Sequence, residues 1–182
     1  MRNRDLAKTS VLLLVLLFLF SVSLEAQTMR NDDDFQKRVK EIEDRLALKE
    51  LVDAFSILAD KKDVKAQTQL FTADGTVETY RKDVLVTKLT GRKAMEDAFG
   101  AFLKNFETVY HFNGQQTVTI KGDKASGVSY CMVTLIGVES SKKMKISIGV
   151  YYHDEYVREN NRWLIAKRRS VFDWEERREL AQ

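Results

Sequence analysis

The chain has 182 residues, of which 44% are hydrophobic and 31% are charged. This composition provides enough apolar side chains for one domain with a sizeable core, and it excludes a disordered chain or a fibrous protein. The net charge of +3 favours no particular charged partner.

The N-terminal residues have the three parts of a secretory signal peptide, namely a basic start, an apolar run and a small residue at the cleavage point. These parts are Arg2, Arg4 and Lys8, then Val11 to Phe20, then Ala26. The apolar run is shorter than the roughly 20 residues that a spanning helix needs. We therefore expect a signal peptide over residues 1–26, a polar linker over 27–34, and an exported protein, periplasmic or secreted, without stable membrane insertion after cleavage. An uncleaved N-terminal anchor is the alternative.

Helical periodicity follows the linker. Apolar residues recur at three- and four-residue steps from Phe35 to Ala59, which predicts one amphipathic helix over 35–60. A short helix is expected over 64–71 with Asp63 as its N-cap, and a strand over 76–80. A third helix follows Gly91. The apolar stripes of these helices are typical of a core.

From Glu107 the apolar period changes to two, which predicts strands. Turns at 121–123, 139–143 and 160–161 separate these strands, the last of which ends at Phe172. Helices followed by hairpin-linked strands indicate an α+β domain, with helices on one face of a mainly antiparallel sheet. We place this domain at 35–174 and expect a short frayed helix or tail over 175–182.

Few residues suit a metal ion or a disulfide. Cys131 is the only cysteine and lies in an apolar strand, which favours a buried small hydrophobe. His153 and Asp154 are strand neighbours that point to opposite faces, and the chain has no third histidine, so we expect no metal. The basic run Lys167 to Arg169 is expected to be solvated and internally paired, with charges on both sheet faces and no nucleic-acid partner.

Several fragments in a fixed order resemble one family. They are Leu58 to Asp63, Leu70 to Gly75, Gly91-Arg92, His111 to Gly114, Gly149 to Tyr156, Trp163 to Ile165 and Arg168-Arg169. Over residues 40–174 the chain resembles the SnoaL-like branch of the NTF2-like superfamily, which includes polyketide cyclases and scytalone dehydratase. The resemblance implies a cone, in which a strongly curved sheet is wrapped by three helices around a pocket, and a homodimer formed through the outer sheet face.

The resemblance also implies a site. Asp60 matches the carboxylate that orients the catalytic histidine, His111 matches that histidine, and Tyr80 matches a tyrosine that polarises the substrate carbonyl. The tyrosine that the dehydratase has before the aspartate is here Ala59, and no counterpart of its second histidine or pocket asparagine is found. Scytalone dehydratase activity itself is therefore not expected. We expect the pocket to be lined by Phe55, Phe99, Phe102 and Met132.

Two functions remain open from the sequence. The first is a cofactor-independent dehydratase, isomerase or cyclase acting on a small hydrophobic carbonyl compound, with His111 as base, Asp60 as orienting carboxylate and Tyr80 as hydrogen-bond donor. The second is a non-catalytic small-molecule-binding or dimerisation module of the cell envelope, in which the histidine and aspartate are a satisfied polar pair.

Overall fold

The computed structural model describes the backbone of residues 2–181 and the side chains of residue 29 and residues 31–181. The chain divides into two compact units, residues 1–44 and 45–182. The elements are α1 (Arg2–Asp60), α2 (Val64–Thr68), β1 (Phe71–Arg81), β2 (Val84–Thr90), α3 (Arg92–Leu103), β3 (Thr108–Lys121), β4 (Lys124–Glu139), β5 (Lys142–Glu159) and β6 (Arg162–Glu179).

The first unit is the N-terminal part of α1. The helix runs without a break through residues 27–34, where the sequence predicted a polar linker, and no glycine or proline is present there to interrupt it. The predicted signal peptide, residues 1–26, has its side chains outside the described part of the chain and stays a prediction. Among the described residues, no helix is both long enough and apolar enough to cross a membrane.

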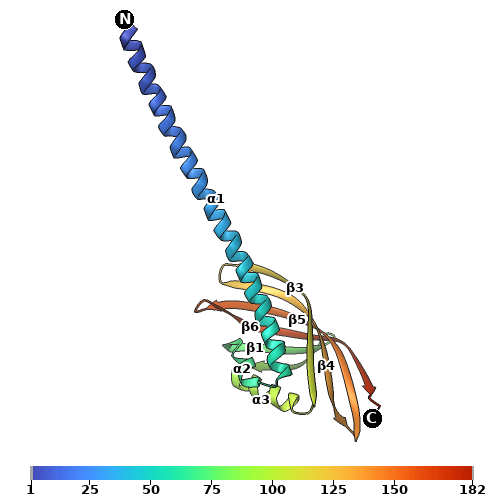
Figure 1. The fold of residues 1–182 in the computed structure, drawn as a ribbon. Helices are drawn as coiled ribbons and strands as arrows, with labels where there is room; N and C mark the ends of the chain where they lie inside the picture. Colours follow the sequence, from blue (N-terminus) through green and yellow to red (C-terminus); the bar gives the residue numbers. More distant parts are fainter. Residues whose placement is uncertain (1, 182) are drawn as a thin grey trace. The chain divides into compact units, whose positions relative to one another are not determined.

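The second unit contains one curved sheet with the strand order β2-β1-β6-β5-β4-β3 (Figure 1). All neighbouring strands are antiparallel except β1 and β6, which are parallel. The end of α1 and the helices α2 and α3 contribute to the core that covers the concave sheet face. This is the predicted α+β arrangement of three helices on a mainly antiparallel, curved sheet.

Three elements differ from the sequence prediction. The edge strand β2 was not predicted, although the β-branched residues Val84, Val86 and Thr87 favour a strand. Helix α2 ends at Thr68, because the chain enters β1 at Phe71. Residues 175–179 are neither helix nor tail, since they pair with Met144–Ile148 and extend β6 to Glu179. That long-range pairing is not visible in the local sequence.

Strand β6 changes face at a bulge. Phe172 pairs with Val150 and Trp174 pairs with Gly149, which leaves Asp173 as the extra residue. Phe172 therefore lies on the concave side, while Trp174 lies on the outer face. A Cβ atom at position 149 would lie 2.1 Å from Trp174 Nε1, so only glycine lets the indole rest on β5.

A fully buried ion pair links β5 and β6 on the concave side. Arg168 donates from Nε to Asp154 Oδ1 at 2.8 Å and from Nη2 to Oδ2 at 2.6 Å, and the Tyr156 hydroxyl donates to the same carboxylate at 2.9 Å. Both charged side chains have 0% exposure. The guanidinium also stacks on the rings of Phe55 and Tyr152, 4.2 and 4.3 Å from their centroids.

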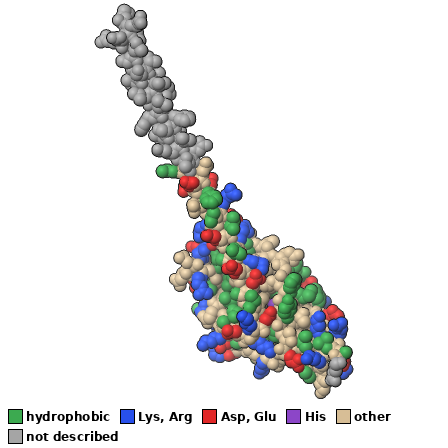
Figure 2. Space-filling model, in the orientation of Figure 1, with side chains coloured by type: hydrophobic (Ala, Val, Ile, Leu, Met, Phe, Trp, Pro, Cys, Tyr) green, Lys and Arg blue, Asp and Glu red, His purple; other side chains and the backbone are tan. Residues whose placement is uncertain are grey.

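This pair corrects one prediction about the basic run 167–169. Its charges do lie on both sheet faces, as predicted, because Lys167 and Arg169 line the outer side and Arg168 points inward. Arg168, however, is not solvated. On the face of the molecule shown in Figure 2, basic and acidic side chains are interspersed with apolar ones.

We predict that Asp154→Asn lowers the free energy of unfolding by about 3 to 5 kcal/mol, because it leaves the Arg168 charge buried without a counter-charge. Urea unfolding followed by circular dichroism measures the change. The matched control is Glu179→Gln, which breaks the exposed Lys142–Glu179 pair and should cost less than about 1 kcal/mol. Equal losses in the two variants would contradict the assigned role of the buried pair.

Candidate functional site

A cavity of about 350 Å³ lies between the concave sheet face and the helices of the second unit. We call it the inner cavity, and its volume lies within the range of small-molecule sites. Most of its wall is apolar, and three lining residues that are about half exposed, Arg81, Val86 and Phe102, mark its open end. The polar residues in the wall are Gln67, Thr79, Arg81, Thr87, His111, Tyr152 and Ser170.

Asp60 and His111 form a close pair in this wall. His111 Nδ1 lies 2.7 Å from Asp60 Oδ1, and the backbone N–H of His111 donates to Asp60 Oδ2 at 3.2 Å. The imidazole is 8% exposed and the carboxylate 26% exposed. Because a carboxylate only accepts, it assigns the proton of a neutral ring to Nδ1 and leaves Nε2 with a free lone pair.

The local chain path brings Asp60 to this position. Asp60 is the last residue of α1, and Lys62 then takes a left-handed conformation with φ of 57° that turns the chain. Asp63 caps α2 by accepting from the Ala66 N–H at 3.1 Å, as predicted. The carboxylate of Asp60 is thus left free of helix capping and can reach β3.

A second polar contact holds β3 against α1. The Asn113 side chain, two residues after His111 and on the same strand face, accepts from Ser56 Oγ at 3.0 Å and donates to Asp53 Oδ1 at 2.9 Å. Asp53, Ser56 and Asp60 lie at helical spacing on one face of α1. The strand that carries His111 is therefore fixed to the helix at two successive inward positions.

The structure places three of the four predicted lining residues in the inner cavity. Phe55, Phe99 and Phe102 line it, and Phe55 meets Phe99 edge-to-face at a centroid distance of 6.2 Å. Met132 does not line it. On β4 the inward residues are Cys131 and Val133, so Met132 between them points to the outer face and is 47% exposed.

Tyr80 is also not brought to the His111 site. Its neighbours Thr79 and Arg81 line the inner cavity, so strand alternation puts Tyr80 on the outer face of β1. There its ring lies under the Arg169 guanidinium, 4.2 Å from centroid to Cζ. The predicted carbonyl-polarising role of Tyr80 in this cavity is therefore wrong.

Two interior groups are poor nucleophiles at neutral pH. Burial raises the pKa of the Cys131 thiol to about 11, and burial also raises the pKa of the Tyr152 hydroxyl. Cys131 thus behaves as the buried small residue that its strand position predicted. Tyr152 keeps its proton and remains a hydrogen-bond donor in the cavity wall.

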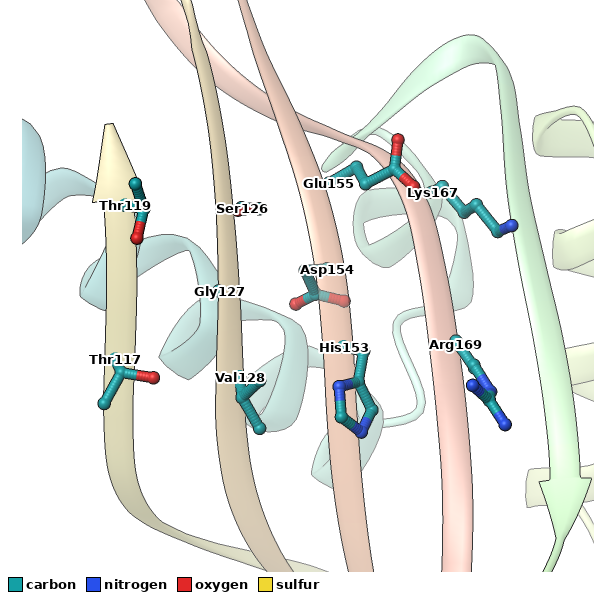
Figure 3. Close-up of a pocket in the computed structure, with 10 residues that line it drawn as sticks. All are labelled: Thr117, Thr119, Ser126, Gly127, Val128, His153, Asp154, Glu155, Lys167 and Arg169. Carbon is teal, nitrogen blue, oxygen red and sulfur yellow. The ribbon is translucent and has the colours of Figure 1, made fainter. Parts of the chain in front are cut away.

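A second hollow of about 510 Å³ lies on the outer face of the sheet (Figure 3). It is lined by polar residues of β3 to β6, including His153, Lys167 and Arg169, and it contains neither Asp60 nor His111. Its cations are engaged already, since Lys167 lies 3.4 Å from Glu78 and Arg169 stacks on Tyr80. The inner cavity, which combines an apolar wall with an oriented imidazole, is the candidate site.

No group of three or more histidine, cysteine, aspartate or glutamate residues that could hold a metal ion is found within the described part of the chain. The chemistry that the site can perform with its own side chains is proton transfer. His111 can accept a proton at Nε2, and Asp60 stabilises the resulting imidazolium.

Comparisons with known proteins identify a family whose members share sequence with most of this chain. The SnoaL-like domain family matches residues 40–169, and the chain belongs to this family. An uncharacterized protein of Mycobacterium tuberculosis is 27% identical over 131 residues, which are 71% of this chain and 86% of that protein.

Two solved structures share the fold at low sequence identity. A putative scytalone dehydratase from Novosphingobium aromaticivorans has a TM-score of 0.66 and 15% identity, over 78% of this chain and 91% of that one. A hexachlorocyclohexane dehydrochlorinase, LinA-type3, from Novosphingobium barchaimii has a TM-score of 0.66 and 17% identity, over 78% and 92%. These likenesses establish the NTF2-like fold.

Proposed function

We propose that this protein binds a small, hydrophobic carbonyl compound in the inner cavity and acts on it as a cofactor-independent lyase or isomerase. The observation that carries the proposal is the 2.7 Å contact between Asp60 and His111 Nδ1 in the wall of an otherwise apolar cavity. An oriented imidazole in a mostly apolar cavity is suited to removing a proton from carbon.

The reaction follows from the two partners. His111 Nε2 takes a proton from the carbon next to the carbonyl, and the electron pair of the broken C–H bond forms an enolate. The imidazolium, stabilised by Asp60, then protonates a departing hydroxyl, which gives dehydration, or another carbon, which gives isomerisation. Attack of the enolate carbon on a second carbonyl of the same molecule gives cyclisation.

The developing oxyanion needs a hydrogen-bond donor other than Tyr80. The residues of the cavity wall that carry a hydroxyl, Thr79, Thr87, Tyr152 and Ser170, are the candidates for this role. Two structures with the same fold are named as a dehydratase and a dehydrochlorinase, and both names denote eliminations, which supports this class of reaction.

The test is deuterium exchange in D2O next to the carbonyl of a panel of small cyclic ketones, read by mass spectrometry. We expect the wild type to accelerate exchange for at least one ketone, and His111→Ala and Asp60→Asn each to slow it by roughly 10²- to 10⁴-fold. His153→Ala is the matched control, because His153 is the only other histidine and lies on the outer face. Ketone binding without exchange above the His111→Ala rate would instead support a non-catalytic binding module.

We further propose that the protein is exported. The support is the sequence pattern of residues 1–26, a basic start followed by an apolar run and Ala26. Expression of the full chain in a bacterium, followed by fractionation and intact-mass measurement, should give an envelope or medium form that lacks these residues. A full-length product in the cytoplasm would contradict export, and a full-length product in the membrane fraction would indicate an uncleaved anchor.

We also propose that the protein is a homodimer. Tyr110, Phe112, Tyr130 and Met132 are about half exposed or more on the outer face of β3 and β4, and Trp174 adds to this apolar surface from β6. Contiguous exposed apolar side chains of this size are typical of an interface.

Light scattering of the purified protein tests the dimer. We expect Phe112→Lys to convert a dimer to a monomer, because it places a charge in the apolar surface. Val84→Lys, which changes an equally exposed valine on the edge strand β2, should leave the mass unchanged. A monomeric wild type, or a dimer insensitive to Phe112→Lys, would contradict the proposed interface.

A further inference from the structure

Gln67 is a buried polar residue in the wall of the inner cavity, and the proton-transfer chemistry does not use it. It lies on α2 with 2% exposure. Its backbone N–H donates to Asp63 O at 2.9 Å, and its carbonyl accepts from the Leu70 N–H at 3.2 Å. Its side-chain Nε2 donates to the backbone oxygen of Phe55 at 3.1 Å. The side-chain oxygen Oε1 is buried and has no hydrogen-bond partner among the described residues.

The orientation of this amide is fixed by chemistry. The carbonyl oxygen of Phe55 can only accept a hydrogen bond, so the amide nitrogen must face it. Turning the amide over would place two acceptor oxygens against each other. The end of Gln67 that is not bound to Phe55 is therefore an acceptor.

An unpaired buried acceptor needs a partner, because leaving it unpaired costs free energy that an apolar residue of the same size would not cost. The lining residues include apolar side chains such as Val77, Phe99 and Leu103. A molecule bound in the cavity can therefore provide a hydroxyl or N–H group for Gln67 while the rest of its surface stays apolar.

We propose that Gln67 is a specificity-determining residue: its Oε1 accepts a hydrogen bond from a hydroxyl or N–H donor on the ligand, so the cavity selects small apolar molecules that carry such a donor. This inference rests on the proposed use of the inner cavity as a ligand site. A ligand analogue without a hydroxyl or N–H group binds more weakly, because the Gln67 acceptor then stays unpaired in the complex.

The test compares two probes with the same ring system, 2-naphthol and 2-methylnaphthalene, which differ by a hydroxyl in place of a methyl group. The ratio of their dissociation constants is measured by titration for the wild type, Gln67→Met and Gln69→Met. Gln69 is the matched control, since it is an exposed glutamine two residues further along the chain. We expect the preference for 2-naphthol to fall about five- to tenfold in Gln67→Met and to stay unchanged in Gln69→Met.

Two results would overturn the inference: the same ratio in the wild type and Gln67→Met, or no binding of either probe to the wild type. A crystal structure of the wild type with 2-naphthol provides a second measurement that does not depend on the variant folding. A naphthol hydroxyl outside hydrogen-bond distance of Gln67 Oε1 would also overturn it. Failure of this inference and failure of the proposed catalysis are distinguishable: if the preference for 2-naphthol falls in Gln67→Met while the wild type accelerates no proton exchange, only the proposed catalysis fails.

Discussion

The buried pair of Asp154 and Arg168 is the interaction on which the inner cavity depends. Two charges with no solvent exposure are tolerated only because they meet in a two-point hydrogen-bonded geometry and because Tyr156 donates to the same carboxylate. The guanidinium supports the rings of Phe55 and Tyr152, which line the cavity. The pair thus sets the register of β5 and β6 and also supports part of the cavity wall.

The candidate site uses the same atoms for folding and for chemistry. The Asp60 carboxylate binds both the ring and the backbone N–H of His111, so it joins the end of α1 to β3 and also orients the imidazole. Asn113 repeats the helix-to-strand contact one step further along β3. Because these contacts hold the imidazole rigidly, little reorganisation is needed when it takes a proton.

Helical positions in the site could be predicted from the sequence better than strand positions. Phe55, Phe99 and Phe102 belong to apolar stripes that identify the inward face of a helix without knowledge of the rest of the fold. Strand residues alternate, so an error of one residue moves a side chain to the opposite face, as happened for Tyr80 and Met132.

Several features missed by the sequence prediction depend on long-range partners. The burial of Arg168 requires Asp154 on the neighbouring strand, and the extension of β6 to Glu179 requires pairing with β5. The role of Gln67 depends on a carbonyl oxygen of α1. In contrast, the pairing of Asp60 with His111 was accessible from the sequence, because both residues lie in fragments that resemble one family.

The bulge at Asp173 lets the last strand contain one extra residue without changing the partners that Phe172 and Trp174 have on β5. Without Asp173, Phe172 and Trp174 would follow one another opposite Val150 and Gly149, so the ladder would become regular and each side chain would keep its face. The family match ends at Arg169, before the bulge, so it includes Asp60 and His111 but not Trp174. The proton-transfer pair thus lies inside the region that the family shares, and a one-residue change of length at the bulge is one that the strand end can accommodate.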